Sequence, residues 1–531
     1  MAGRSGPLDA RRTVVPPPPT TGCTRETTVL ATVQSSTLHG VDGHPIRVEV
    51  HVSSGLPSFS MVGLPDASCR EARDRVRAAL LSSELQWPMQ RITVNLAPSA
   101  LPKLGTSLDL AVAVATQVAV GEVDVEATEG WAFLGELGLD GALRPVRGIV
   151  ALVAGLRGRV RGVVVPEAAH AEAALVPGIE VRCGDTIGRV VRSLKGEAPW
   201  PDPPPRPAPL PPVQPDLLDV RGQPVARHVL EIAAAGGHHL LLSGPPGAGK
   251  TLLATRLPGL LPDLDDDAAL EVTAIHSAAG ERVDGQLVRR PPFRAPHHTA
   301  SAVALIGGGS SVMRPGEIAL AHRGVLFADE LGEFSPMVLD ALRQPLEEGS
   351  VRISRAKGTV TYPTRFQFVA ATNPCPCGPT TKGCRCSEAG KARYRRRLSG
   401  PLLDRFDLRL EVGSPDAGDL LAEPDGQPSH VVAERVRAAR ARAGRRGVEL
   451  NADLRGPDLD DIAPLEAPAS KLLERMVRRG RLTARGLHRI RRVARTIADL
   501  EDHDGPLTEA QVAAALAFRV TTSRADAAVA S

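Results

Sequence analysis

The chain has 531 residues, 42% of them hydrophobic, which is enough to build about three or four globular domains with buried cores. Its 64 lysines and arginines are balanced by 60 acidic residues, so any attraction to nucleic acid or membrane must come from local clusters of charge. The sequence lacks a signal-peptide pattern at its start and has no apolar run near the roughly 20 residues that span a bilayer. We therefore expect a multidomain cytoplasmic protein that makes no membrane contact.

Two proline-rich segments divide the chain. The first, VVPPPPTTG, lies near the start, and the second, WPDPPPRPAPLPPVQP at residues 200–215, should form a stiff and extended spacer. After this spacer, apolar runs alternate with helical patterns, whereas beyond about residue 420 only Arg-rich helical patterns remain. From these changes we predict a disordered tail at 1–28, an N-terminal α/β domain at 29–197, a proline-rich linker at 198–215, an α/β nucleotide-binding domain at 216–415, a C-terminal helical domain at 416–520 and a tail at 521–531.

Three apolar runs in the central region predict buried parallel strands between helices: HHLLLSG, GVLFADE and FQFVAATN. In the C-terminal region, apolar residues recur at three- and four-residue spacing, which predicts a helix with one apolar face; they are Leu487, Ile490, Ala494 and Ile497. The expected fold class is therefore a multidomain α/β protein with a helical C-terminal part.

The segment LLLSGPPGAGKTLLA contains the phosphate-binding pattern G-x-x-x-x-G-K-[ST] between a predicted strand and a predicted helix. Glycines at such a loop let backbone N–H groups surround phosphates, while Lys250 pairs with the outer phosphates and the Thr251 hydroxyl reaches Mg²⁺. The predicted ATP-binding residues are Gly244, Pro245, Pro246, Gly247, Ala248, Gly249, Lys250 and Thr251.

The segment HRGVLFADE supplies an acidic pair at the end of a predicted strand, where open α/β sheets hold ligands. We expect Asp329 to hold Mg²⁺ together with Thr251, and Glu330 to orient or deprotonate the attacking water. An acidic pair after a strand is common by itself, but in combination with the phosphate-binding loop it predicts an ATP hydrolase.

Several longer motifs resemble the magnesium-chelatase-like AAA+ ATPases of the YifB/ComM type, over about residues 29–520. These motifs are GPPGAGKT, FRAPHHTASAVALIGGG, RPGEIALAHRGVLFADELGEF and ATNPCPCG followed by RYRRRLSGPLLDRFDL. The resemblance implies that Asn373 orients water near the γ-phosphate, that Arg405 reaches into a neighbouring subunit and that Arg485 is the sensor of the helical lid. It also implies a ring, by resemblance a hexamer. For each arginine the alternative is a solvated surface charge.

Two N-terminal motifs, PKLGTSLDLAVAVA and FLGELGLDGALRPVRGIVALVAG, resemble the proteolytic domain of Lon protease, which has a ribosomal-S5-like α/β fold. The resemblance places Ser107 at the position of the nucleophile but Val150 where the catalytic lysine belongs. Lys103 is too near Ser107 in sequence to be assumed a substitute, and a serine hydroxyl without a base is a weak nucleophile. We expect a Lon-like domain without peptidase activity.

Four of the seven cysteines, Cys375, Cys377, Cys384 and Cys386, lie close together in two Cys-x-Cys pairs. Four thiolates can close a tetrahedral structural zinc site, although one-residue spacing is unusual and no histidine accompanies them. Buried free cysteines are the alternative, while a small-ring disulfide is disfavoured in the cytoplasm. The adjacent His297 and His298 should point to different sides of a strand, so we expect polar loop contacts there rather than a single-ion site.

Arginines are concentrated at residues 391–397, 434–446 and 475–495. On a helix, Arg435, Arg442 and Arg446 share one face that would suit a phosphate backbone, but a solvated helix face is an equal alternative. Because only 3% of residues are aromatic, DNA contact should be to the backbone, sequence-tolerant and salt-dependent.

Together with the family resemblance, these basic segments predict a ring ATPase that remodels DNA, by helicase or branch-migration activity in recombination or transformation. The alternative is an ATP-driven remodeller of a protein partner, as in magnesium chelatase.

Overall fold

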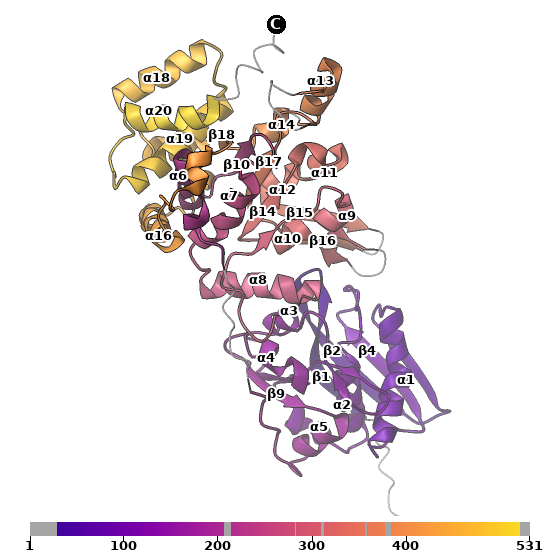
Figure 1. Ribbon diagram of the computed structural model, residues 1–531. Helices are drawn as coiled ribbons and strands as arrows, with labels where there is room; N and C mark the ends of the chain where they lie inside the picture. The colour runs from indigo at the N-terminus through magenta and orange to yellow at the C-terminus, as the bar shows by residue number, and fades with distance from the viewer. Residues whose placement is uncertain are drawn as a thin grey trace, which may run out of the picture.

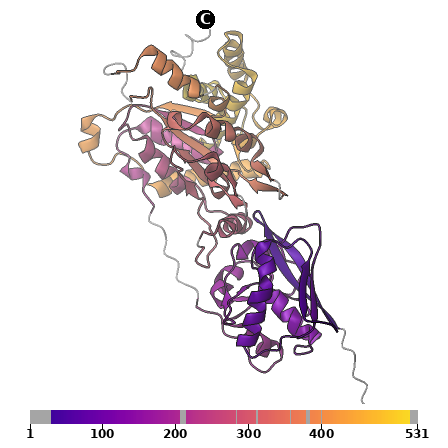
Figure 2. The same ribbon diagram turned by 90° about the vertical axis from the view of Figure 1, so that its right-hand side faces the viewer.

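The computed structural model describes residues 29–205, 214–281, 283–309, 313–355, 358–377, 384–398 and 400–520. Both views show an N-terminal α/β part at one end of the molecule and C-terminal helices at the other, with a second α/β part between them (Figure 1, Figure 2). The predicted tails at 1–28 and 521–531, and residues 206–213 of the predicted linker, lie outside the described residues. No helix in the described part of the chain is both long and apolar enough to cross a membrane.

The N-terminal part is built on a mixed sheet that has seven strands among the described residues, in the order β3-β4-β2-β1-β5-β8-β9. The long β1 and β2 form an antiparallel hairpin, and β5, β8 and β9 continue the sheet in parallel. The strands are β1 (Val29–His39), β2 (Asp42–Ser53), β3 (Ser58–Val62), β4 (Arg91–Ala97), β5 (Trp131–Phe133), β8 (Gly162–Pro166) and β9 (Glu180–Gly184), with a small hairpin of β6 (Glu136–Leu137) and β7 (Leu143–Arg144).

Helix α2 (Asp109–Ala119) forms the centre of the N-terminal core. All of its residues are buried, and eight of the eleven in DLAVAVATQVA are apolar, as expected for a helix enclosed by other elements. It packs on β1 and β2 and lies beside α1 (Ala67–Ser82). The other helices here are α3 (Ile149–Ala154), α4 (His170–Ala173) and α5 (Ile187–Leu194). The predicted α/β character of this region is therefore confirmed.

The central part contains a parallel sheet with five strands among the described residues, in the order β11-β14-β17-β10-β18. Its strands are β10 (Leu240–Ser243), β11 (Phe293–Arg294), β14 (Val325–Ala328), β17 (Gln367–Thr372) and β18 (Leu408–Glu411). The three predicted buried strands are confirmed as β10, β14 and β17. Their uninterrupted apolar runs follow from burial on both faces: Leu240 and Leu242 pack into one core, and Leu241 into the core on the other face.

Helices and two hairpins surround this sheet. The hairpins are β12 (Gly307–Gly308) with β13 (Arg314–Pro315), and β15 (Ser350–Arg355) with β16 (Gly358–Pro363). The helices are α6 (Pro224–Gly236), α7 (Lys250–Arg256), α8 (Asp266–Ala279), α9 (Ala302–Ile306), α10 (Glu317–Leu320), α11 (Pro336–Ala341), α12 (Arg343–Glu348), α13 (Glu388–Arg397), α14 (Gly400–Leu403) and α15 (Ala417–Leu421).

The C-terminal helices share one core with the parallel sheet. They are α16 (Ser429–Arg445), α17 (Gly456–Ile462), α18 (Ala467–Arg478), α19 (Ala484–Leu500) and α20 (Glu509–Val520). The helix predicted from apolar spacing is α19: Ile490, Ala494 and Ile497 are buried, and the face they form packs against α6, α16 and α20. Because this core is continuous with the sheet, the helical part is held in a fixed place behind it.

The N-terminal part contacts the central part mainly through α8, which lies against α3 (Figure 1). The Arg147 guanidinium donates a hydrogen bond of 2.6 Å to the Ala278 carbonyl oxygen. The β1–β2 turn contacts β16, where a Cβ atom added at Gly40 would lie 2.2 Å from a Val360 methyl carbon. The two parts are therefore packed together at two separate places.

A buried charged group in α19 provides a test of this packing. The Asp499 carboxylate is fully buried and bound by Arg495, Arg446 and Asn451, and Arg495 is itself only 1% exposed. Asp499→Ala leaves the Arg495 charge buried without its counter-ion, which should cost about 3–5 kcal/mol in the free energy of unfolding of the helical part.

Urea denaturation followed by circular dichroism would measure this change. The matched control is Asp460→Ala, because Asp460 is 78% exposed and its pair with Arg491 should be worth no more than about 1 kcal/mol. Equal unfolding midpoints for the two variants would contradict the assignment of Asp499 to a stabilising buried network.

Candidate nucleotide-binding site

The predicted phosphate-binding loop, residues 244–251, follows the carboxyl end of β10 and leads into α7. Gly247 and Gly249 have φ values of 78° and 86°, a left-handed conformation that glycine adopts at little cost. Gly244 also needs to be glycine, since a Cβ atom there would lie 2.1 Å from the Val412 carbonyl oxygen. The loop thus has the bent backbone that can direct N–H groups at phosphates.

Lys250 spans the inside of this loop. Its Nζ donates hydrogen bonds to the carbonyl oxygens of Gly244 at 2.8 Å and Pro245 at 2.9 Å, and to Oδ1 of Asn373 at 3.0 Å. The side chain is only 8% exposed, and burial lowers its pKa, although the charges of Asp329 and Glu330 act in the opposite direction. The structure therefore brings the predicted phosphate-binding lysine to Asn373, which follows β17.

Thr251 and Asp329 are also in contact. The Thr251 hydroxyl donates to Asp329 Oδ2 at 2.7 Å, and Asp329 Oδ1 accepts from the Glu330 backbone N–H at 2.9 Å. Hydroxyl and carboxylate oxygens are the donor atoms that Mg²⁺ binds in proteins, so this pair fits the metal for which the two residues were predicted.

Glu330 follows Asp329 in a left-handed conformation, with φ of 51°, which is uncommon for a residue other than glycine. Its side chain is 51% exposed, and Oε2 lies 3.4 Å from Nδ1 of His298. His297 and His298 lie in a loop after β11, not in a strand, and their ring centroids are 4.1 Å apart. The expectation that they point to different sides of a strand was therefore wrong, while the expected polar loop contacts are present, including that of His297 with Thr299.

Arg405 and Arg485 lie away from the phosphate-binding loop of the same chain. Arg405 precedes β18, so it is at the amino ends of the parallel strands, whereas the loop follows the carboxyl end of β10. Both arginines line a cleft of about 940 Å³, together with Arg489 and Arg492. The Arg405 guanidinium donates to the Glu347 carboxylate and to the Pro401 carbonyl oxygen. The predicted loop residues, the acidic pair and Asn373 therefore lie at one edge of the sheet, and these two arginines lie at the other.

Sequence reasoning missed most of the charged residues of this cleft, among them Arg489, Arg492 and Glu347. A signal for two of them was available, because Arg485, Arg489 and Arg492 recur at spacings of four and three, which places them on one face of α19. Glu347 carries no comparable signal, because its contact with Arg405 joins residues that are 58 positions apart.

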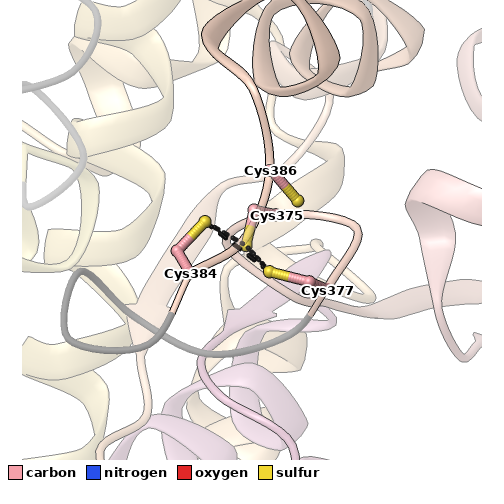
Figure 3. Close-up of side chains that lie close together, drawn as sticks. All are labelled: Cys375, Cys377, Cys384 and Cys386. Atoms are coloured by element: carbon pink, nitrogen blue, oxygen red, sulfur yellow. Dashed lines mark hydrogen bonds between the residues drawn. The ribbon is translucent and has the colours of Figure 1, made fainter.

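The four clustered cysteines converge as the sequence suggested (Figure 3). The Cys375 sulfur lies 3.3 Å from that of Cys377 and 3.6 Å from that of Cys384, and all four sulfurs are within 4.8 Å of one another. In a tetrahedral zinc–thiolate site with bonds of about 2.3 Å, the sulfurs are separated by about 3.8 Å. The donor set and its spacing therefore fit one zinc ion. A hydrogen bond from the Arg385 backbone N–H, together with neighbouring thiols, lowers the pKa of Cys377 to about 6.

In the N-terminal part, Ser107 does not contact a base among the described residues. Its hydroxyl donates to the Ser36 carbonyl oxygen at 3.2 Å, and the nearby Lys103 amine donates instead to the Pro98 carbonyl oxygen. Burial lowers the pKa of Lys103. Val150, which stands where the Lon resemblance requires a lysine, is buried in the apolar core around α3.

The predicted phosphate-tracking face of α16 is occupied by ion pairs within the chain. Arg435 pairs with Glu231 at 2.5 Å, Arg446 pairs with Asp499 at 2.6 Å, and Arg442 pairs with Asp502. These pairs neutralise the three arginines, which argues against a DNA-binding role for this face; the arginines bind acidic residues of the same chain and do not form the solvated face given as the alternative.

Three neighbouring parallel strands each end in a functional segment: β10 in the phosphate-binding loop, β14 in the acidic pair and β17 in Asn373. This arrangement is that of a P-loop protein of the AAA+ class. Family comparisons support this class. The model described as magnesium chelatase, subunit ChlI, matches residues 216–420, that of subunit ChlI of Mg-chelatase matches 48–169, and that of the ChlI C-terminal region matches 426–519.

Three relatives extend the similarity over most of the chain. The uncharacterized protein Rv2897c of Mycobacterium tuberculosis is 46% identical over 497 residues, covering 92% of this chain and 98% of the relative. The uncharacterized protein YifB of Escherichia coli is 44% identical over 477 residues, with coverage of 90% and 94%. Competence protein ComM of Haemophilus influenzae is 40% identical over 503 residues, with coverage of 92% and 97%. The chain belongs to the YifB/ComM family of magnesium chelatase-like AAA+ proteins, as the sequence resemblance predicted.

Proposed function

We propose that this protein is an ATP hydrolase that uses the energy of ATP to remodel DNA in the cytoplasm. The observation that carries the ATPase assignment is the convergence of Lys250 with Asn373 and of Thr251 with Asp329 at one edge of the sheet. The phosphates of ATP would lie against the loop of residues 244–251, and Lys250 would exchange its internal carbonyl contacts for phosphate oxygens.

Each remaining residue at this edge has a role that suits its chemistry. Thr251 and Asp329 would hold Mg²⁺, which when bound neutralises charge on the outer phosphates. Glu330 would accept a proton from the attacking water, since its carboxylate is half exposed and follows directly after the metal-binding position. Asn373 would orient that water, because its amide lies next to the Lys250 amine.

A second subunit would complete the site. Arg405 and Arg485 are at the opposite edge of the sheet from their own phosphate-binding loop, in a cleft lined by both arginines and acidic residues. Head-to-tail contacts place this cleft against the loop of the next subunit and generate a ring, which we propose is a hexamer. The arginines would then stabilise the negative charge that develops during phosphoryl transfer.

Replacement of Arg405 tests this assignment. Arg405→Ala should lower kcat for ATP hydrolysis at least about a hundredfold, because one cation at the developing charge is lost, and should leave ATP affinity within about twofold. Steady-state kinetics and titration with a fluorescent ATP analogue would measure the two quantities. Arg352→Ala, on the exposed side of β15, is the control, and normal turnover by Arg405→Ala would refute the assignment.

DNA is the substrate we propose for the mechanical work. The relative ComM is named a competence protein, and a ring ATPase that moves along incoming DNA, by helicase or branch-migration activity, would serve recombination or transformation. Because the α16 arginines are paired internally, DNA contact must come from other basic residues and should be to the phosphate backbone.

The decisive experiment compares ATP hydrolysis without DNA and with single-stranded, duplex or four-way-junction DNA over a series of salt concentrations. We expect stimulation that weakens as salt rises, since phosphate contacts release counter-ions, and no hydrolysis by the control Glu330→Gln. Hydrolysis that no DNA stimulates would instead favour the remodelling of a protein partner, as in magnesium chelatase.

We also propose that Cys375, Cys377, Cys384 and Cys386 hold a structural zinc ion, which would tie the end of β17 to the start of α13. The supporting observation is the fit of the four sulfur positions to one tetrahedral ion.

Protein purified under reducing conditions without chelators should contain about one zinc per chain. The Cys375→Ser variant should lose most of this zinc, and the Cys183→Ser variant should keep it, because Cys183 lies outside the cluster. Absence of zinc from the unmodified protein would contradict the proposal.

For the N-terminal domain we propose a Lon-like fold that has no proteolytic activity. The support is the lack of a base at Ser107 among the described residues and the burial of Val150 where a lysine would be required. Casein should remain intact in the presence of ATP, and degradation that Ser107→Ala abolishes would overturn the proposal.

A further inference from the structure

Glu330 has one side-chain partner within ion-pair distance in the part of the chain that the structure describes, and that partner is the imidazole of His298. The His298 Nδ1 lies 3.4 Å from Glu330 Oε2, and the described residues provide no other hydrogen bond or ion pair to this carboxylate. Oε2 therefore has a protein partner, whereas Oε1 remains available to a water molecule.

The position of His298 is set by secondary structure on both sides. It follows β11, which pairs in parallel with β14, so the carboxyl ends of these strands bring His298 and Glu330 to the same edge of the sheet. At the end of β11, Arg294 binds Glu317 at 2.7 Å and Glu281 at 2.9 Å, which anchors the strand. After His298 the chain enters α9, whose N-cap Ser301 accepts a hydrogen bond from the Ala304 N–H.

Glu330 needs such a partner for a physical reason. Its side chain is 51% exposed and has three rotatable bonds, so without a contact its carboxylate would sample several orientations. A general base must lie within hydrogen-bond reach of the proton that it accepts, and small displacements of a reacting group reduce the rate strongly. His298 is 29% exposed and therefore less free to move than the carboxylate.

We propose that His298 is a positioning residue for ATP hydrolysis, holding the Glu330 carboxylate in the orientation from which its second oxygen meets the attacking water. This inference rests on the proposed role of Glu330 as the base. It gives a function to His298 of the PHH motif, for which the sequence predicted only polar loop contacts. His298 contacts neither the phosphate-binding loop nor the Thr251–Asp329 pair by any hydrogen bond or ion pair found among the described residues, so its effect should be on turnover and not on binding.

The test compares four variants for kcat, for KM of ATP and for affinity to a fluorescent ATP analogue. His298→Ala should lower kcat by roughly tenfold or more, with KM and affinity within about twofold, since only the orientation of the base is lost. His298→Asn should recover most of the rate, because the amide nitrogen of Asn occupies nearly the place of Nδ1. His297→Ala is the matched control, because the described residues place no contact between His297 and Glu330, and should keep kcat within about twofold.

Glu330→Gln separates this inference from the proposed function. If Glu330→Gln is inactive and His298→Ala retains or exceeds the normal kcat, the positioning role is refuted while the catalytic role of Glu330 stands. If His298→Asn is as slow as His298→Ala, the nitrogen contact is not what matters and the proposal also fails. If Glu330→Gln retains normal turnover, Glu330 is not the base, and the proposed function and this inference fail together.

Discussion

Parallel pairing on either side of β10 is the constraint on which the rest of the structure depends. Ser243 of β10 is level with Thr372 of β17, and Ala370 of β17 is level with Ala328 of β14. Because the strands run in the same direction, the residues that follow them emerge at one edge of the sheet. The phosphate-binding loop, the acidic pair and Asn373 are brought together by this register, although they are far apart in the sequence.

Because β18 also pairs in parallel with β10, the segment before β18 lies at the opposite edge of the sheet from the phosphate-binding loop. Leu240 at the start of β10 is level with Leu408, so Arg405 cannot approach the phosphate-binding loop that follows β10. The helical part holds α19 firmly against the sheet through a shared apolar core and the buried Asp499–Arg495 pair. Arg485, Arg489 and Arg492 therefore occupy a fixed place in the cleft beside Arg405. We propose that the loop of one chain and the cleft of another together form a complete catalytic site, and this separation within one chain is the physical basis of the proposed ring.

Much of the parallel sheet and of its loop edge was predictable from the sequence, because those features are local. Runs such as LLLS and VLFA are apolar throughout only when both faces are buried, and GPPGAGKT defines a loop by its glycines and lysine. The convergence of Cys375, Cys377, Cys384 and Cys386 was also predictable, since short spacing limits how far the thiols can separate.

The features that escaped prediction depend on long-range contacts. The face of Arg435, Arg442 and Arg446 follows from helical periodicity, but the acids that neutralise it come from α6 and α19 and their surroundings. Likewise the contact between His298 and Glu330 exists because β11 and β14 pair, and the assumption of a strand at His297 and His298 gave the wrong ring directions. Periodicity shows which residues share a face, whereas their partners are set by the tertiary fold.

We propose that each catalytic site is shared between two chains, and mixed rings test this sharing directly. Chains carrying Glu330→Gln and chains carrying Arg405→Ala, each inactive alone, would be labelled with different affinity tags and purified through both tags. In random head-to-tail rings about a quarter of the sites combine an intact loop with an intact arginine, so about a quarter of normal hydrolysis should return. Mixed rings as inactive as their components would show that both residues act within one chain, which contradicts a site shared between subunits.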